Sequence, residues 1–181
     1  YKNIVIGGTT AKENNFVMHG VGDFAFFPEL RFLDYVGTTS FFGDSTDTEY
    51  KQNLSEYKYT FAGCTKLMKG TNNSLIRKLA DSPSDITGMF SGTSKDVTGT
   101  SGKRSSIVAN KLSFEYLMIL DRAFESSGYT AGLDGKLKQI ENKALESAIA
   151  TFKGAKYAKG LWSLKKKLSN TATVTELLAN N

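Results

Sequence analysis

The stretch KLKQIENKALESAIATFKGAKYAKGLWSLKKKL, residues 136–168, decides the fold that the sequence predicts. Its apolar residues recur every three or four positions, which is the period of an amphipathic helix. This spacing predicts one helix over 136–153, ended by Gly154, and a second helix over 155–168. Glu141 falls at the centre of the first helix's apolar stripe, where it is either a buried ion-pair partner or a residue at the exposed edge of the core.

Two neighbouring segments extend the helical interpretation of this C-terminal part. Residues 112–124 carry apolar side chains on most faces of a helical wheel, which predicts a helix buried on most sides. Thr173 and Glu176 match a capping box, which predicts that a last short helix begins there. The C-terminal 70 residues are therefore expected to form a helical hairpin or small bundle.

The N-terminal part is rich in aromatic residues and glycine, and we expect it to form short strands and short helical segments. Alternating aromatic and polar residues, or β-branched runs that end at Gly or Pro, indicate strands. Short strands or extended segments are expected at 3–6, 24–27 and 57–61, and short helical segments at 29–35 and 74–79.

Together these patterns predict an α+β fold, with a mostly α protein with long loops as the alternative. The predicted organisation is a mixed part over 1–80, a Ser/Thr/Gly-rich loop or linker over 81–106 and a basic helical part over 107–181, packed as one unit. No internal repeat is evident from the sequence.

Composition excludes several classes of site. The single cysteine excludes an intramolecular disulfide framework and a zinc site built from several cysteines, and the single histidine excludes sites with two histidines. No apolar run approaches the roughly 20 residues of a membrane-spanning helix. The chain begins at Tyr1 without a signal-peptide pattern, which fits either a soluble protein whose leader was removed or a fragment, of unknown compartment.

The net charge of +5 is unevenly distributed and points to one basic segment. Trp162 lies about 140° from Tyr157 on the helical wheel, on the charged side of the predicted helix over 155–168. A tryptophan among cations is typical of an anchor for an acidic partner, although a solvated lysine face would give the same pattern. The candidate partner-binding residues are Lys156, Lys159, Trp162, Lys165, Lys166 and Lys167.

Other motifs are weaker. Residues 99–105 resemble a phosphate-binding loop, but Val97 stands where the pattern needs its first glycine and Arg104 where it needs a hydroxyl. Residues 44–49 lack the glycine of a calcium loop. His19 and Cys64 show no local catalytic signature, and Cys64 is a candidate attachment point for a covalent group.

These observations favour a non-catalytic structural or assembly subunit. It would use its basic helical face to bind acidic proteins in a larger complex, as linker polypeptides of light-harvesting antennae or virion components do. No cofactor is expected. The alternatives are an enzyme or small-ligand-binding protein with an aromatic-lined pocket, and a module that binds anionic lipid or nucleic acid.

Overall fold

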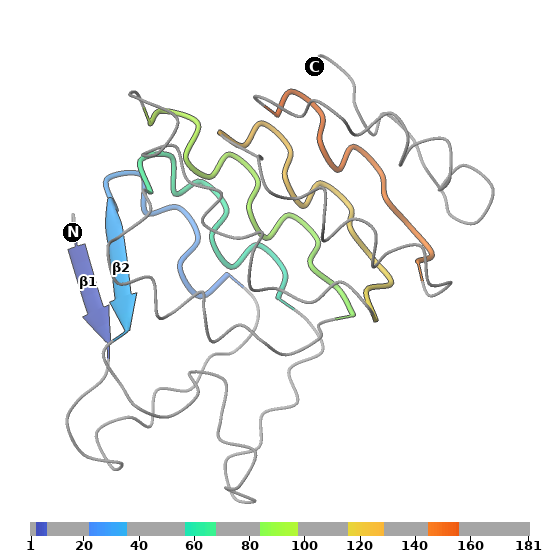
Figure 1. Cartoon of the computed structure of the whole chain (residues 1–181), viewed down its shortest axis with the longest axis horizontal. Coiled ribbons are helices and arrows are strands. Elements are labelled where there is room, and N and C mark those ends of the chain that lie inside the picture. The colour runs from blue at the N-terminus through green and yellow to red at the C-terminus, as the bar shows by residue number, and fades with distance from the viewer. Residues whose placement is uncertain are drawn as a thin grey trace, which may run out of the picture.

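A computed structural model describes residues 3–6, 22–35, 57–67, 84–97, 116–128 and 145–155 (Figure 1). The described residues contain no helix and two short strands, β1 (Asn3–Ile6) and β2 (Phe32–Tyr35). The two strands pair in parallel, with Asn3 opposite Phe32 and Ile6 opposite Tyr35. The strand predicted at 3–6 is therefore confirmed.

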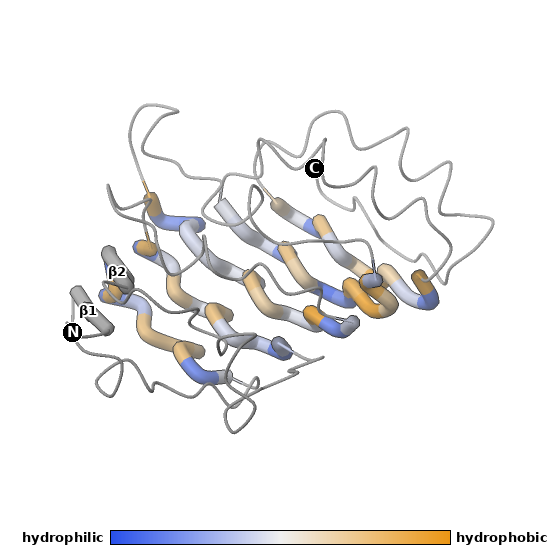
Figure 2. The backbone as a smooth tube through the Cα atoms, turned by 60° about the horizontal axis from the view of Figure 1, so that its bottom comes forward, coloured by the Kyte–Doolittle hydropathy of each residue, from blue (hydrophilic) through white to orange (hydrophobic). Residues whose placement is uncertain are grey.

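The rest of the described chain is a stack of turn segments that lie side by side in sequence order (Figures 1 and 2). We call these segments rungs, because each one is hydrogen-bonded to the next through its backbone. They are rung 1 (22–30), rung 2 (57–67), rung 3 (84–97), rung 4 (116–128) and rung 5 (145–155).

Backbone hydrogen bonds join the rungs at equivalent positions. Each of rungs 1 to 4 has a central phenylalanine whose amide donates to a carbonyl of the next rung. The acceptor is the residue just before the next rung's phenylalanine, as Phe61 donates to the Met89 carbonyl at 2.8 Å. The amides two residues before and two residues after each phenylalanine also donate to carbonyls of the next rung. Tyr59 donates to the Thr87 carbonyl, and Gly63 donates to the Ser91 carbonyl. These bonds satisfy backbone groups that would otherwise be costly to bury.

Within a rung, the chain advances as a series of overlapping four-residue β-turns. In rung 4, Ala123 donates to Leu120, Glu125 to Arg122, and Ser127 to Phe124, so each amide bonds three residues back. Every rung places the residues two before and two after its phenylalanine at positive φ, a region that costs most residues other than glycine about 1–2 kcal/mol. A continuous α-helix is impossible with this backbone.

The core of the stack is a ladder of phenylalanine rings, one from each rung. Neighbouring rings are nearly parallel, and their centroids lie 5.7 Å apart for Phe24–Phe61 and 5.3 Å apart for Phe124–Phe152. Phe61–Phe90 and Phe90–Phe124 are both 5.5 Å apart. Such offset stacks add about 0.5–1.5 kcal/mol per pair beyond the burial of apolar area.

The predicted α+β fold with a helical C-terminal hairpin is wrong for the described residues. Residues 116–124 and 145–153, which lie inside two of the predicted helices, form rungs 4 and 5 instead. The error has a physical cause, because this series of overlapping β-turns buries residues at a spacing close to that of an amphipathic helix. In rung 4 these buried residues are Leu117, Leu120, Ala123 and Phe124.

Several short elements differ from the prediction for related reasons. Residues 24–27 and 57–61 belong to rungs and are turns rather than strands, whereas the end of the segment predicted as helical, 29–35, is β2. Residues 84–97 of the Ser/Thr/Gly-rich segment form rung 3, in which Ile86, Met89 and Phe90 are buried. The elements predicted at 74–79, at 156–168 and around Thr173 lie outside the described residues.

Candidate interaction surface

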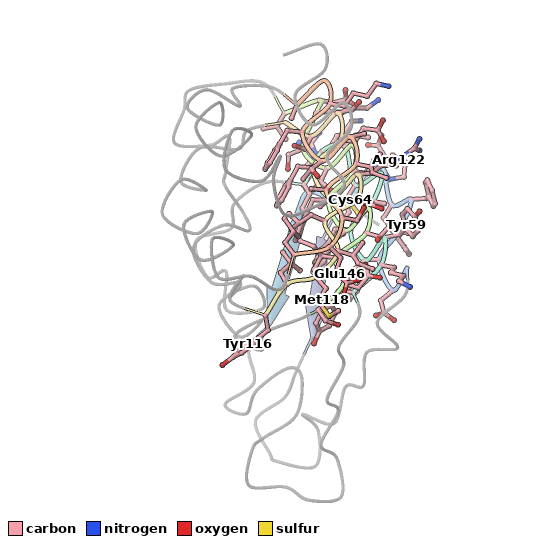
Figure 3. All side chains as sticks on the ribbon, turned by 90° about the vertical axis from the view of Figure 1, so that its right-hand side faces the viewer. Tyr59, Cys64, Tyr116, Met118, Arg122 and Glu146 are labelled. Carbon is pink, nitrogen blue, oxygen red and sulfur yellow. The ribbon has the colours of Figure 1, made fainter. Side chains whose placement is uncertain are left out.

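One side of the stack is formed by the outward residues of the turns, and we call it the turn face. It consists of the exposed residues at the positions two before and two after each phenylalanine, such as Phe26, Tyr59 and Arg122, whereas Gly88 and Ala150 at these positions are buried. Tyr59 and Arg122 point to this side, whereas Tyr116 points away from it (Figure 3). Because backbone amides and carbonyls are used in the turns and between rungs, recognition on this face must come mainly from side chains.

Two aromatic side chains stand exposed on this face at strained backbone positions. Phe26 has φ 60° and a side chain that is 78% exposed, and Tyr59 has φ 56° and is 42% exposed. Neither ring contributes to the phenylalanine ladder. Positive φ recurs at these positions in every rung, so the distinguishing feature of Phe26 and Tyr59 is that a bulky, exposed ring occupies a position where such residues are uncommon.

Each of these rings lies against a glycine of the next rung. A side chain on Gly63 would meet the ring of Phe26, and a side chain on Gly88 would meet the ring of Tyr59. Both glycines are also at positive φ. The glycines therefore allow the two aromatic rings to lie on the surface of neighbouring rungs while one side of each remains accessible. Phe27, 36% exposed, adds apolar surface beside Phe26.

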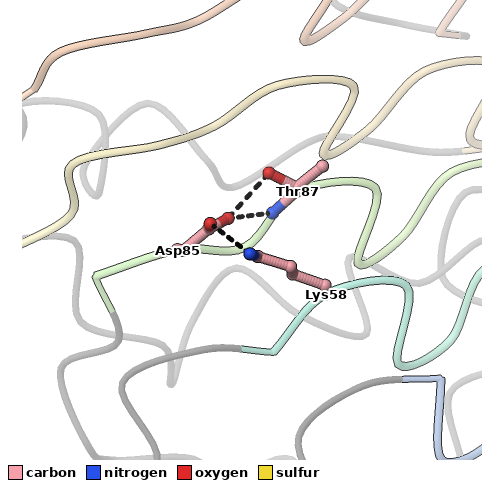
Figure 4. A network of polar contacts seen from close by, with 3 residues as sticks. All are labelled: Lys58, Asp85 and Thr87. Carbon is pink, nitrogen blue, oxygen red and sulfur yellow. Dashed lines mark hydrogen bonds and ion pairs between the residues drawn. The ribbon is translucent and has the colours of Figure 1, made fainter.

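Ion pairs tie neighbouring rungs together around these aromatic residues. The Asp85 carboxylate accepts hydrogen bonds from the backbone amide of Thr87 at 2.9 Å and from its hydroxyl at 2.7 Å, and it lies 3.3 Å from the Lys58 ammonium (Figure 4). Lys66 of rung 2 pairs with Glu29 of rung 1. These charges are largely neutralised within the molecule.

Further along the turn face, on rungs 4 and 5, the described ion pairs and side-chain hydrogen bonds involve polar residues. Arg122 pairs with Glu125 across one turn, at 3.7 Å. Asp121 accepts from the Ser147 hydroxyl at 2.6 Å and from the Ile149 amide at 2.8 Å, which joins rung 4 to rung 5. The exposed aromatic side chains of the turn face thus lie on rungs 1 and 2.

Cys64 lies in the core, three residues after the phenylalanine of its rung, and this position has an equivalent in the next rung. Its thiol is fully buried and donates to the Phe24 carbonyl of the preceding rung at 3.0 Å. In the next rung the equivalent residue, Thr93, donates to the Phe61 carbonyl at 2.8 Å. Burial raises the pKa of Cys64 from 9.0 to about 11, against a smaller lowering by the Phe27 backbone. Covalent attachment at Cys64 stays a prediction, and it would require the thiol to leave this packed position.

The remaining predicted site residues are not described. The basic segment lies outside the described ranges, and so do His19 and Glu141. The residues predicted to bind a partner there are Lys156, Lys159, Trp162, Lys165, Lys166 and Lys167.

The described ranges contain neither a cluster of metal-ligating residues nor a membrane-spanning helix. No group of three or more His, Cys, Asp or Glu residues there could hold a metal ion. Likewise, no helix in the described part of the chain is both long enough and apolar enough to cross a membrane.

Sequence reasoning missed the turn face because it missed the repeat. A usable signal is present, since three of the core phenylalanines are followed by a glycine two positions later. These are Phe61–Gly63, Phe90–Gly92 and Phe152–Gly154. The core phenylalanines are 37, 29, 34 and 28 residues apart, and this irregular spacing hides the pattern from a search for a fixed period.

The described fold thus defines a class, a stacked repeat in which each segment contacts its sequence neighbours. Comparison with known proteins adds no family to this class: no family model, no curated protein and no solved structure matches the chain.

Proposed function

We propose that this protein is a non-catalytic structural or assembly subunit that binds other proteins. The observation that carries the proposal is the pair of exposed aromatic residues on the turn face, Phe26 and Tyr59, at backbone positions where a bulky residue is unfavourable. Stacked repeats commonly use an extended side of the stack for protein binding. Exposed aromatic side chains are frequent anchors of such interfaces.

A second contact is proposed for the basic segment. Lys156, Lys159 and Lys165–Lys167 surround Trp162 in the sequence and would bind an acidic protein surface. Association through this segment would weaken with rising salt, because exposed charges are screened. Association through the turn face would respond much less, since the charges around Phe26 and Tyr59 are largely paired. Salt dependence therefore separates the two contacts.

The turn-face contact is tested with the double variant Phe26→Ser, Tyr59→Ser. The full chain is used as bait in a native extract, and the partners that remain bound in high salt are cross-linked and identified by mass spectrometry. We expect the double variant to lose these partners, because both aromatic anchors are removed. Its melting temperature should change little, since neither ring belongs to the phenylalanine ladder and both serines keep the backbone hydrogen bonds to the next rung.

Tyr116→Ser is the matched control for this experiment. Tyr116 is 59% exposed and points away from the turn face, so its removal deletes a comparable aromatic surface elsewhere (Figure 3). If the control and the double variant lose the same partners to the same extent, the binding is explained by nonspecific contacts with exposed aromatic side chains and not by the turn face.

The basic segment is tested by combining Trp162→Ala with the charge reversals Lys159→Glu and Lys166→Glu. We expect this variant to lose acidic partners that the wild-type chain retains in low salt, because the anchor and two cations are gone. The variant should keep the wild-type circular dichroism spectrum. Retention of the same partners in low salt would show that this segment does not bind them.

The other functions considered from the sequence stay predictions. An aromatic-lined pocket has no support among the described residues, where Phe24, Tyr57 and Phe61 are packed in the stack. Anionic lipid or nucleic acid would bind through the basic segment. This binding would also weaken with rising salt concentration, so measurements in low and high salt would detect it.

A further inference from the structure

We draw no further inference here: the strongest candidate, the aromatic patch of Phe26, Phe27 and Tyr59 on the turn face of rungs 1 and 2, belongs to the surface already proposed for binding, and nothing in the structure shows which kind of partner covers it.

Discussion

The buried thiol of Cys64 shows how one residue contributes to the stack. A thiol at this position can donate to the Phe24 carbonyl only while it is protonated. Burial disfavours the thiolate and raises the pKa of Cys64 to about 11. The unfolded chain, in contrast, ionises this thiol at its ordinary pKa of 9.0. The contribution of Cys64 to stability is therefore complete below pH 9 and is lost as the pH rises towards 11.

We expect Cys64→Thr to remove this pH dependence. Thr93 occupies the equivalent position in the next rung and makes the same type of hydrogen bond, so threonine should be tolerated at neutral pH. Between pH 9 and pH 11 the wild-type chain should lose about 2–3 kcal/mol of unfolding free energy relative to the variant, from a shift of roughly two pKa units. Urea unfolding of both chains at each pH measures this difference. A difference that stays constant across this range would show that Cys64 ionises normally in the folded chain.

The rung depends on residues that adopt positive φ at two fixed positions, and several of these residues are glycines. Positive φ two residues before the core phenylalanine recurs in every described rung, at Gly22, Tyr59, Gly88, Arg122 and Ala150. Gly22 and Gly88 share this position and nearly the same φ, +68° and +59°. They differ in their surroundings, because only Gly88 lies under an aromatic ring.

This pair of glycines separates backbone strain from close packing. Gly22→Ala should cost about 1 kcal/mol, the strain of a side chain at positive φ, since its new methyl group meets only Ala25 at 3.8 Å. Gly88→Ala should cost about 1 kcal/mol more, because the ring of Tyr59 must also move. Unfolding free energies from denaturant titration give both values.

A double-mutant cycle checks the cause of the extra cost. In a Tyr59→Ala background, Gly88→Ala should cost no more than Gly22→Ala does in the wild-type chain, because the ring is absent. If the extra cost persists without the ring, then contact with Tyr59 does not explain the glycine at this position.

At the scale of the whole molecule, stability depends on contacts between successive rungs. Hydrogen bonds and ring stacking both run from one rung to the next, so an interior rung couples the two sides of the stack. Phe90 holds the central place in the ladder, stacked on Phe61 on one side and on Phe124 on the other.

Phe90→Ala should therefore destabilise the chain by about 3–5 kcal/mol and weaken the coupling between rungs 2 and 4. Hydrogen exchange measured by mass spectrometry should show lost protection in both neighbouring rungs. Ser91→Ala is the control, since it changes the adjacent, partly exposed residue of the same turn, and its effect should stay within about 0.5 kcal/mol. Lost protection confined to rung 3 would mean that the rungs are not coupled through the ladder.

The sequence alone was sufficient for local features that depend on residue type. The predicted strand β1, Asn3–Ile6, contains three β-branched residues in a row. The apolar residues predicted to be inside a core, such as Leu120 and Phe124, are buried. The single cysteine and the single histidine exclude whole classes of site without any structure. The uneven charge likewise follows from the sequence, although its function remains a proposal.

Only the tertiary structure revealed the stack. An apolar residue every three or four positions fits an amphipathic helix and also a series of overlapping β-turns. The choice between them depends on hydrogen bonds to rungs 28 to 37 residues away. Positive φ at Tyr59 or Arg122 is unfavourable in isolation and persists because bonds to the next rung hold it. The turn face follows from the same long-range pairing, which leaves Phe26 and Tyr59 exposed although no local pattern predicted it.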